Sequence, residues 1–546
     1  MNMRKTTGQI ISRQDAEKAE RKKAFFCLLF AFAFFTVLGF YVDRYIHIKA
    51  LYTDDLYTWS CYGEQNFWEF AFPFRTSSRF RPVYWTATFL EMMIIRTHIS
   101  WFVPVNIILN AGIALTLYIM AKRLSRSFPA ALLTGSLFLI SRFAYYQIGQ
   151  ALGLLETMAQ WMALMVLWFL YSFINARKQP FRKPDANASV SSDLMSRSRT
   201  AAAGRQGVRW FYYACIMYFI LAFTHERYVG LLPLFYLALL FTETAPGIRK
   251  WKLWLLPAAD FAVIFLIRRI MIGQALPAGT GGTEVTDTFH LGQALSFAVN
   301  QVQYIFGVNI GPSYLSGITW KDCAPYIHYL VYASWLPLAA VAVTFVTVSV
   351  RKALISRQWT GSNLLFLMFI ALCIGCSSVT IRVEMRWVYV SYSASLLYLS
   401  YMLGVIRRAL GSKAGRWIAA AAFGLYFLLM APVEKYYRTY YSQIYFWEDQ
   451  DRMNSLYDET IGKYGTDGVL GKQVYIIGNT YKMTDFYART FFKVFDPAKT
   501  GQGTRISFAE TKADLPAAAD AQNSIVLMEV PEARGYQDVT EEVLGK

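Results

Sequence analysis

Long apolar blocks recur along the whole chain and constrain its fold more than any other feature. The hydrocarbon core of a bilayer is about 30 Å thick, and an α-helix of about 20 apolar residues crosses it. Of the 546 residues, 55% are hydrophobic and only 16% are charged. A soluble chain of this length would need more charge to cover the surfaces of its domains. We therefore expect an all-α polytopic membrane protein.

The first apolar block, 24–42, follows a basic run that ends at Lys23. A basic run before an apolar block also begins a secretory signal peptide. However, no small-x-small cleavage site follows, because the chain continues with Asp43 and Arg44. We interpret the block as an uncleaved signal anchor that keeps the amino terminus in the cytoplasm.

Clusters of Lys and Arg stand at the ends of the apolar blocks, as the positive-inside rule requires. They account for the net charge of +18 without nucleic acid as a partner. The spans that agree with these clusters are 24–42, 101–121, 129–147, 157–176, 210–226, 228–243, 252–271, 327–350, 362–379, 387–406 and 414–432. Two shorter apolar stretches, 82–97 and 292–308, are expected to lie at or dip into the outer face, so we predict about 11–13 transmembrane helices.

The loop at 177–209 holds eight Arg and Lys, with Ser and Ala between them. This composition predicts a polar, disordered linker on the cytoplasmic side.

After Pro432 the chain becomes polar and mixed in charge. Three short runs of β-type residues, Val474–Ile477, Arg505–Phe508 and Ile525–Val530, are separated by polar and helical stretches. We therefore divide the chain into a transmembrane domain, 1–432, and a small α/β domain, 433–546. The odd number of spans places this second domain on the extracytoplasmic side.

Charges at membrane depth are costly and are usually functional, so their distribution matters. In this topology they gather on the outer side. The first outer loop, 43–80, carries Asp54 and Asp55 among aromatic residues and leads into Arg81-Pro82. One of the two aspartates could instead cap the helix that follows.

Later outer turns carry further polar residues. These are Arg142, Tyr146, Glu156, His225, Glu226, Arg382, Glu384 and Arg386. Internal salt bridges, such as Glu226 with Arg142 or Glu384 with Arg386, are the structural alternative. The planar fork of Arg meets phosphate oxygens in pairs, and a carboxylate is the natural general base for a sugar hydroxyl.

This pattern resembles the multispanning glycosyltransferases of the GT-C fold, a family that includes the lipid A aminoarabinose transferase and the protein O-mannosyltransferases. Members carry one or two acidic residues in the first outer loop, where Asp54-Asp55 stand, and a basic-Pro pair that opens the next helix, as Arg81-Pro82 does. Glu156 stands for the acidic residue of the second outer turn, and His225-Glu226 for a basic-Glu pair in a later one.

The resemblance implies transfer of a sugar from a polyprenyl-phosphate donor to an envelope glycan, lipid or polymer, at the outer face of a bacterial cytoplasmic membrane. It implies that Asp54 or Asp55 is the base, with Glu156 as a further catalytic carboxylate. It implies that the donor phosphate is held by arginines, for which the candidates are Arg81, Arg142, Arg382 and Arg386. His225, Glu226 and Tyr146 are further site candidates, and whether Mg²⁺ or Mn²⁺ bridges Asp54 or Asp55 to the phosphate stays open.

Three other functions fit parts of the same pattern. A polysaccharide polymerase or ligase would use a pyrophosphate-linked donor. A transporter or flippase would show internal repeats and mid-bilayer charges, whereas here the polar residues lie at one face. A membrane scaffold would have no need of Asp54-Asp55 close to Arg79 and Arg81.

Overall fold

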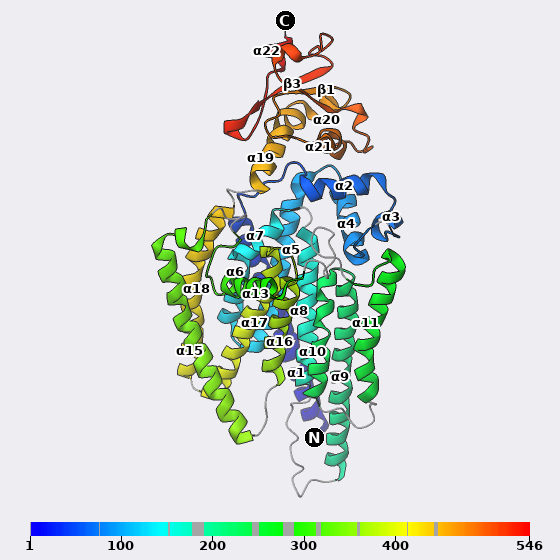
Figure 1. Ribbon diagram of the computed structural model, residues 1–546. Helices are drawn as coiled ribbons and strands as arrows, with labels where there is room; N and C mark the ends of the chain where they lie inside the picture. The colour runs from blue at the N-terminus through cyan, green and yellow to red at the C-terminus, as the bar shows by residue number, and fades with distance from the viewer. Residues whose placement is uncertain are drawn as a thin grey trace.

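The computed structural model describes residues 2–75, 77–150, 153–176, 190–242, 250–276, 289–312, 318–356, 361–411, 413–441 and 446–545. Long helices packed side by side make up most of the molecule, and a small domain of helices and strands covers one end of them (Figure 1). The chain is therefore a helical, multi-pass membrane protein with a small α/β domain at its C-terminus, as the sequence predicts.

Each predicted span falls on a helix. These helices are α1 (Asn2–Val42), α5 (Phe102–Ser125), α6 (Phe128–Ile140), α8 (Leu154–Asn175), α9 (Val190–Ala222), α10 (Pro233–Leu240), α11 (Lys250–Ile272), α15 (Pro325–Ser356), α16 (Gly361–Ser378), α17 (Met385–Leu410) and α18 (Lys413–Tyr441). Within the described residues, 6 helices are long and apolar enough to cross a membrane, and they lie in α1, α5, α8, α15, α16 and α17.

Two predicted spans are interrupted. The span predicted at 129–147 divides at Ser141 into α6 and α7 (Arg142–Ile148). The span predicted at 228–243 consists of the 3-10 helix η3 (Glu226–Leu231) and then α10. At 1.5 Å per residue, α10 is only about 12 Å long and cannot cross the bilayer alone. The prediction of one uninterrupted helix is therefore wrong at each of these two places.

The predicted linker is also partly helical. Residues 190–209 form the first part of α9, so the prediction of disorder is wrong for this segment. Its three consecutive alanines, 201–203, favour a helix because Ala has the highest intrinsic helix propensity. Residues 177–189 of the predicted linker lie outside the described residues.

Local signals fix several helix ends. Between α5 and α6 the chain turns at Arg126, which has a left-handed backbone with φ of 54°. Ser127 then caps α6, because its hydroxyl accepts a hydrogen bond from the N–H of Ala130 at 3.4 Å. Helix α17 ends at Gly411, whose φ of 59° suits a residue without a Cβ atom.

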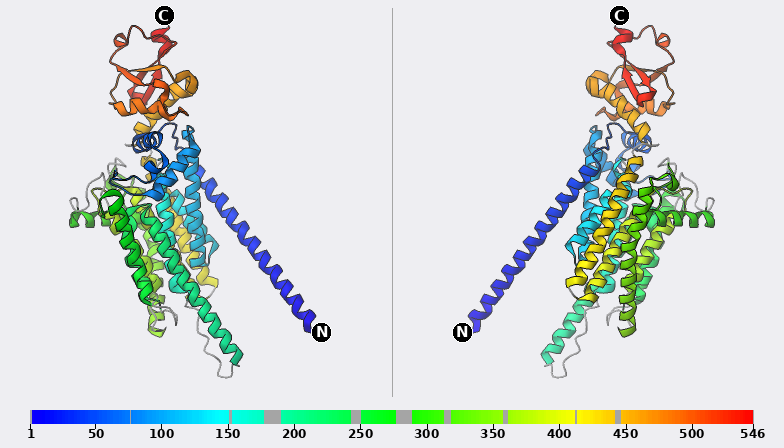
Figure 2. Two further views of the ribbon diagram at one scale, coloured as in Figure 1. Left: turned by 90° about the vertical axis from the view of Figure 1, so that its right-hand side faces the viewer. Right: turned by 90° about the vertical axis from the view of Figure 1, so that its left-hand side faces the viewer.

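The two shorter apolar stretches form α4 (Pro82–Ile95) and α13 (Leu291–Ile305). Helix α13 stands at a steep angle to the long helices (Figure 2). One face of α13 is anchored through Gln301, whose side chain bonds the hydroxyls of Ser377 and Ser378 at 2.6 and 2.9 Å. Its other face exposes Leu291 and Leu295, the amphipathic character of a helix at a membrane surface. That location stays a prediction.

The C-terminal domain is built around one mixed sheet. Its elements are α19 (Phe446–Tyr457), α20 (Lys463–Val469), β1 (Gln473–Ile477), α21 (Asp485–Thr490), β2 (Ile506–Ala509), β3 (Ser524–Val530), β4 (Gly535–Asp538) and α22 (Thr540–Leu544). The strand order is β2-β1-β3-β4, with β1 parallel to β2 and β3, and β4 antiparallel to β3. The three predicted strands are confirmed. The fourth, Gly535–Asp538, was not predicted.

Helix α18 continues through Pro432, the predicted domain boundary, to Tyr441. Two buried ion pairs hold its upper part. Glu434 binds Arg142 of α7, with Oε1 and Nη1 2.6 Å apart, and Arg438 binds Asp43 at the end of α1. Because buried pairs of this kind are costly to break, the ends of the first and last membrane helices are tied together. The division of the chain at residue 432 stays a proposal.

Candidate active site

The predicted acidic pair lies in the first turn of α2 (Thr53–Glu64). The N-cap position of this helix is Tyr52, so neither aspartate is the cap, and that alternative is wrong. The helix dipole favours negative charge in the first turn. Asp54 is exposed and Asp55 is only 4% exposed. The two adjacent carboxylates therefore face different surroundings.

The carboxylate of buried Asp55 affects the pKa values of two residues of α4, Tyr84 and Glu91. Its charge contributes to the raised pKa of the Tyr84 hydroxyl, for which burial is the larger cause. Burial, and secondarily the Asp55 carboxylate, raise the pKa of Glu91 to about 8. Asp55 thus lies near a buried region in which the carboxyl group of Glu91 stays protonated at neutral pH.

Arg81 and Glu226 form a bidentate ion pair. Nε of Arg81 donates to Oε2 of Glu226 at 2.5 Å, and Nη2 donates to Oε1 at 2.9 Å. Both side chains are buried, with 6% and 3% exposed. Arg81 stands at the N-cap position of α4, and Glu226 begins η3. The Arg81-Pro82 and His225-Glu226 motifs are therefore in direct contact.

His225, which precedes Glu226 in the chain, lies close to Glu156. Its Nδ1 accepts a hydrogen bond from the backbone N–H of Arg227 at 3.4 Å. A neutral imidazole then carries its proton on Nε2, which lies 3.6 Å from Oε1 of Glu156. At that distance the contact is electrostatic rather than a hydrogen bond. Glu156 itself is buried in the first turn of α8.

The segment before α17 forms a compact charged group. Arg382 donates to Oε1 of Glu384 through Nε at 2.7 Å and through Nη2 at 2.6 Å, and Arg386 also binds this carboxylate. The expected salt bridge between Glu384 and Arg386 is confirmed. The two arginines keep access to solvent, since 50% of the Arg382 side chain and 25% of the Arg386 side chain are exposed.

Arg79 links these groups. Its pKa is lowered first by the charge of Arg81 and then by burial, with Arg386 acting in the same direction, while Glu226 and Asp54 oppose the shift. Arg227 and Arg386 also lie close enough to act electrostatically on Glu156. The structure therefore brings the acidic pair, the Arg81–Glu226 pair, the His225–Glu156 contact and the Arg382–Glu384–Arg386 group into one charged cluster, which we call the polar cluster. The catalytic and binding roles of its residues stay predictions.

Arg142 has a different setting. In addition to its ion pair with Glu434, its Nη2 donates to the carbonyl oxygens of Tyr304 and Asn309 at 2.8 and 3.1 Å. Its guanidinium also lies 4.5 Å from the ring centre of Tyr437, and the side chain is fully buried. The alternative pair of Arg142 with Glu226 is wrong, because each of them binds another partner. These contacts occupy much of the Arg142 guanidinium, and its role in donor binding stays a prediction.

Tyr146, another candidate, belongs to α7, but its side chain lies outside the described part of the structure.

Arg268 of α11 was missed by the sequence analysis. Its side chain is 1% exposed and donates to the carbonyl oxygens of Ala275 and Leu276, each at 3.2 Å. It also lies within electrostatic reach of Glu226 and Arg81. The signal that could have found it is the presence of an ionisable residue inside an apolar helix.

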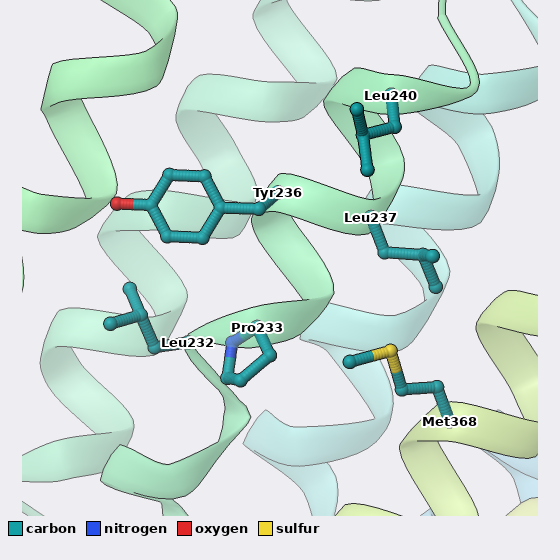
Figure 3. Close-up of a pocket in the computed structure, with 6 residues that line it drawn as sticks. All are labelled: Leu232, Pro233, Tyr236, Leu237, Leu240 and Met368. Atoms are coloured by element: carbon teal, nitrogen blue, oxygen red, sulfur yellow. The ribbon is translucent and has the colours of Figure 1, made fainter.

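An apolar groove of about 260 Å³ lies between α10 and α16. It is lined by Leu232, Pro233, Tyr236, Leu237, Leu240 and Met368 (Figure 3). This lining offers no carboxylate or cation for catalysis. The polar cluster is therefore the better candidate for the active site.

No protein-family model and no curated protein matches the chain. Among solved structures it is similar to the archaeal oligosaccharyltransferase AglB from Archaeoglobus fulgidus, in complex with an inhibitory peptide and a dolichol-phosphate. That match has a TM-score of 0.41 and 13% identity, and it covers 87% of this chain and 64% of AglB. The chain thus spans less than two thirds of the length of that protein.

It is also similar to ArnT from Cupriavidus metallidurans in the apo state, with a TM-score of 0.38, 11% identity, and coverage of 93% of this chain and 94% of ArnT.

Proposed function

We propose that this chain is a membrane glycosyltransferase that transfers a sugar from a polyprenyl-phosphate donor to a hydroxyl of an envelope glycan or lipid. The observation that carries the proposal is the position of an exposed carboxylate, Asp54, within electrostatic reach of Arg79, beside the arginines of the polar cluster. A base for the acceptor and a cationic site for the leaving phosphate are the two groups that this reaction needs.

Asp54 is the proposed base, because an acceptor hydroxyl can reach an exposed carboxylate. It takes the hydroxyl proton while the acceptor oxygen forms a bond to the anomeric carbon. The bond between that carbon and the phosphate oxygen breaks, and both of its electrons leave with the phosphate. Buried Asp55 would support the loop from within instead of meeting the acceptor.

The leaving phosphate is the proposed ligand of Arg386 and Arg382, with Arg79 nearby. The first two keep part of their surface exposed, and guanidinium groups bind phosphate oxygens in pairs. The fork of Arg81 already faces Glu226. We therefore assign Arg81 and Glu226 to positioning the cluster, and His225 and Glu156 to shaping its electrostatic field.

The described residues do not fit a metal ion held by the protein alone. No group of three or more His, Cys, Asp or Glu side chains with suitable geometry occurs in the described ranges. Asp54 and Asp55 also face opposite surroundings, exposed and buried. The proposed mechanism therefore uses no metal ion held by these residues.

We place the reaction at the extracytoplasmic face of a bacterial cytoplasmic membrane, with the amino terminus in the cytoplasm. The support is the distribution of basic clusters in the sequence together with the position of α2, which carries Asp54 and Asp55, beneath the C-terminal domain (Figure 1).

The test is transfer of a labelled sugar to membrane acceptors by the purified full chain. It is offered the sugar either on polyprenyl monophosphate or on polyprenyl diphosphate. Release of polyprenyl phosphate from the first donor supports the proposal, and activity only with the second would favour a polymerase or ligase. Binding of both donors with no transfer by the wild type would contradict a transferase.

A further inference from the structure

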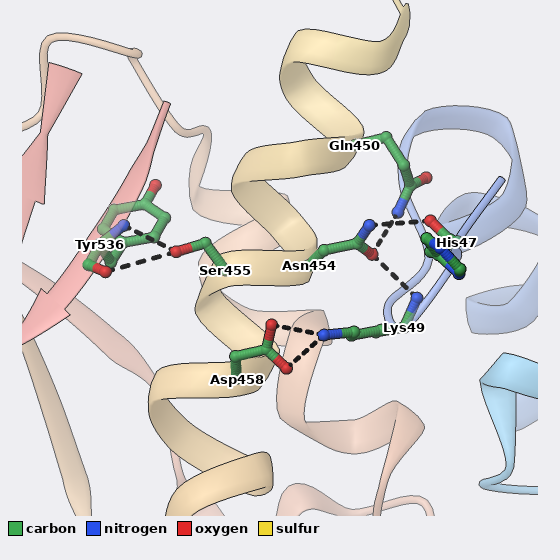
Figure 4. Close-up of polar contacts among 7 residues, drawn as sticks. All are labelled: His47, Lys49, Gln450, Asn454, Ser455, Asp458 and Tyr536. Atoms are coloured by element: carbon green, nitrogen blue, oxygen red, sulfur yellow. Dashed lines mark hydrogen bonds and ion pairs between the residues drawn. The ribbon is translucent and has the colours of Figure 1, made fainter. Parts of the chain in front are cut away.

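Side chains of α19 hold the backbone of the chain just before the acidic pair. Oδ1 of Asn454 accepts the backbone N–H of Lys49, and its Nδ2 donates to the carbonyl oxygen of His47, each at 2.8 Å. Gln450, one turn earlier in the helix, donates to the carbonyl oxygen of Ala50 at 2.8 Å. Figure 4 shows these side chains of one helix facing one short segment of the loop.

The same helix is fastened to the sheet of the C-terminal domain. The hydroxyl of Ser455 accepts the backbone N–H of Tyr536 in β4 at 2.9 Å and donates to its carbonyl oxygen at 3.3 Å. Asp458, which directly follows α19, binds Nζ of Lys49 at 2.6 Å. Helix α19 therefore connects β4 to the loop segment that leads to the acidic pair (Figure 4).

The last residue before α2, Tyr52, is held at its hydroxyl and at its ring. The hydroxyl donates to Oδ2 of Asp449 in α19 at 2.6 Å. The other oxygen of Asp449 accepts from Nη1 of Arg452 at 2.7 Å, which fixes the carboxylate. The ring of Tyr52 stacks on the ring of Tyr487 in α21, with centres 5.4 Å apart and planes inclined by 19°.

The backbone of Tyr52 starts the helix that carries the acidic pair. Its carbonyl oxygen accepts the backbone N–H of Asp55 at 3.1 Å. Between these two residues, Thr53 has a φ of 46°, in the left-handed region where a β-branched side chain is strained. A conformation of this kind persists only where its surroundings hold it. The place of Tyr52 therefore sets the direction of the first turn of α2, in which Asp54 and Asp55 lie.

From these contacts we propose that Asp449 is a positioning residue for the acidic pair. By holding the hydroxyl of Tyr52 it fixes the residue whose carbonyl oxygen accepts the N–H of Asp55, and so it directs Asp54 toward the polar cluster. A carboxylate of the C-terminal domain then determines the place of the proposed base. This inference rests on the proposed function for its consequence in catalysis, but its structural part can be tested independently.

The first test is the variant Tyr52→Phe in the full-length chain. It keeps the ring that stacks on Tyr487 and removes only the hydroxyl that Asp449 holds. We expect kcat for sugar transfer to fall by about 10- to 100-fold, with little change in the KM for the donor, because a misplaced base slows the reaction without weakening the binding of the phosphate. Asp449→Ala should have an effect of the same size.

Asp467→Ala is the matched control, because Asp467 is an exposed aspartate of α20 in the same domain. It should leave kcat unchanged. Wild-type kcat in Tyr52→Phe overturns the inference while leaving the proposed function intact.

The double variant separates positioning from direct contact with the substrate. If Tyr52 and Asp449 act through their one hydrogen bond, Tyr52→Phe combined with Asp449→Ala lowers kcat no further than either change alone. If Asp449 touched the acceptor, Asp449→Ala would lower kcat far more than Tyr52→Phe, and the two effects would add. Additive effects therefore overturn the inference.

Hydrogen exchange supplies a readout that does not need activity. A peptide that covers 53–57 should exchange faster in Tyr52→Phe and in Asp449→Ala than in the wild type, because the N–H of Asp55 loses its fixed acceptor. Peptides from β1 and β3 should exchange at the same rate in all three proteins. Unchanged exchange at 53–57 would also overturn the inference. Absence of transfer by the wild type would count against the proposed function only.

Discussion

Arg81 and Glu226 are joined by two parallel hydrogen bonds in a buried site, although 145 residues separate them in the chain. This pair connects the start of α4 to the turn between α9 and α10. It therefore fixes the position of the first loop relative to the middle of the helical bundle.

Breaking that pair should destabilise the protein. Removing one partner of a buried ion pair leaves an uncompensated charge and costs about 3–5 kcal/mol. We expect Glu226→Gln to lower the free energy of unfolding by about this amount in detergent, and Arg81→Lys to lower it as well, because an ammonium group lacks the fork. Equal stability of Glu226→Gln and the wild type in urea unfolding would refute the role of the pair.

Asp54→Asn should reduce sugar transfer by the roughly 10²–10⁴-fold typical of a lost general base. The amide keeps the shape of the carboxylate but cannot take the proton. Transfer is measured from a labelled polyprenyl-phosphate sugar in membranes normalised for protein level. Glu64→Gln, at the other end of the same helix, is the control and should retain activity. Full activity in both Asp54→Asn and Asp55→Asn would remove the main support for the proposed function.

Arg386→Ala should weaken donor binding, because a charge-assisted hydrogen bond to phosphate is worth about 1.5–3 kcal/mol. Arg386→Lys should also weaken it, since the charge remains but the fork does not. Glu384→Gln separates the two roles. If Arg386 serves only its ion pair, that variant should weaken donor binding as much as Arg386→Ala does. Arg489→Ala, in an exposed ion pair on α21, should bind donor like the wild type.

Glu91 should make the stability of the protein depend on pH. Its pKa rises from an ordinary 4.5 to about 8 in the folded protein. Between these two values the unfolded chain has lost the proton that the folded chain keeps, so stability falls as the pH rises through this window. Glu91→Gln should flatten the pH profile of thermal unfolding and be the more stable protein near pH 8. Parallel profiles for the variant and the wild type would contradict the assignment.

The topology predicts that the C-terminal domain lies outside the cytoplasm. A reporter that is active only in the extracytoplasmic space should be active when it is fused after Lys546. A reporter that is active only in the cytoplasm would place the polar cluster on the opposite side of the membrane, where the proposed donor and acceptor would have to be sought instead.

Periodicity and composition were sufficient to predict the elements that depend on local sequence. The long apolar blocks gave helices, and the β-branched residues of 474–477 and 525–530 gave strands. The break at Ser141 was missed, because apolar and aromatic residues resume at Phe143 directly after Ser141 and Arg142. The helix is interrupted where Arg142 turns to meet Glu434, a partner 292 residues away. Tertiary contacts of this kind leave no mark in a local window.

The candidate site was predictable in its residue types but not in its pairing. Asp54, Arg81 and Glu226 are conspicuous because they stand on the predicted outer side, away from the basic clusters that mark the cytoplasmic ends of the spans. Which arginine faces Glu226 depends on how α4 and α9 pack, so the expected partner Arg142 was wrong.

The buried pair of Asp43 with Arg438 has a mechanical consequence. It closes the polypeptide into a ring that begins at the end of α1, passes through the bundle and returns along α18. The segment that carries Asp54 lies within this ring, just after Asp43, and the side chains of Asn454 and Gln450 in α19 hold its backbone at Lys49 and Ala50. Its travel is therefore short. A lipid-linked sugar and its acceptor would have to approach a nearly stationary carboxylate. Any gating motion would have to come from parts of the chain away from the Asp43–Arg438 pair.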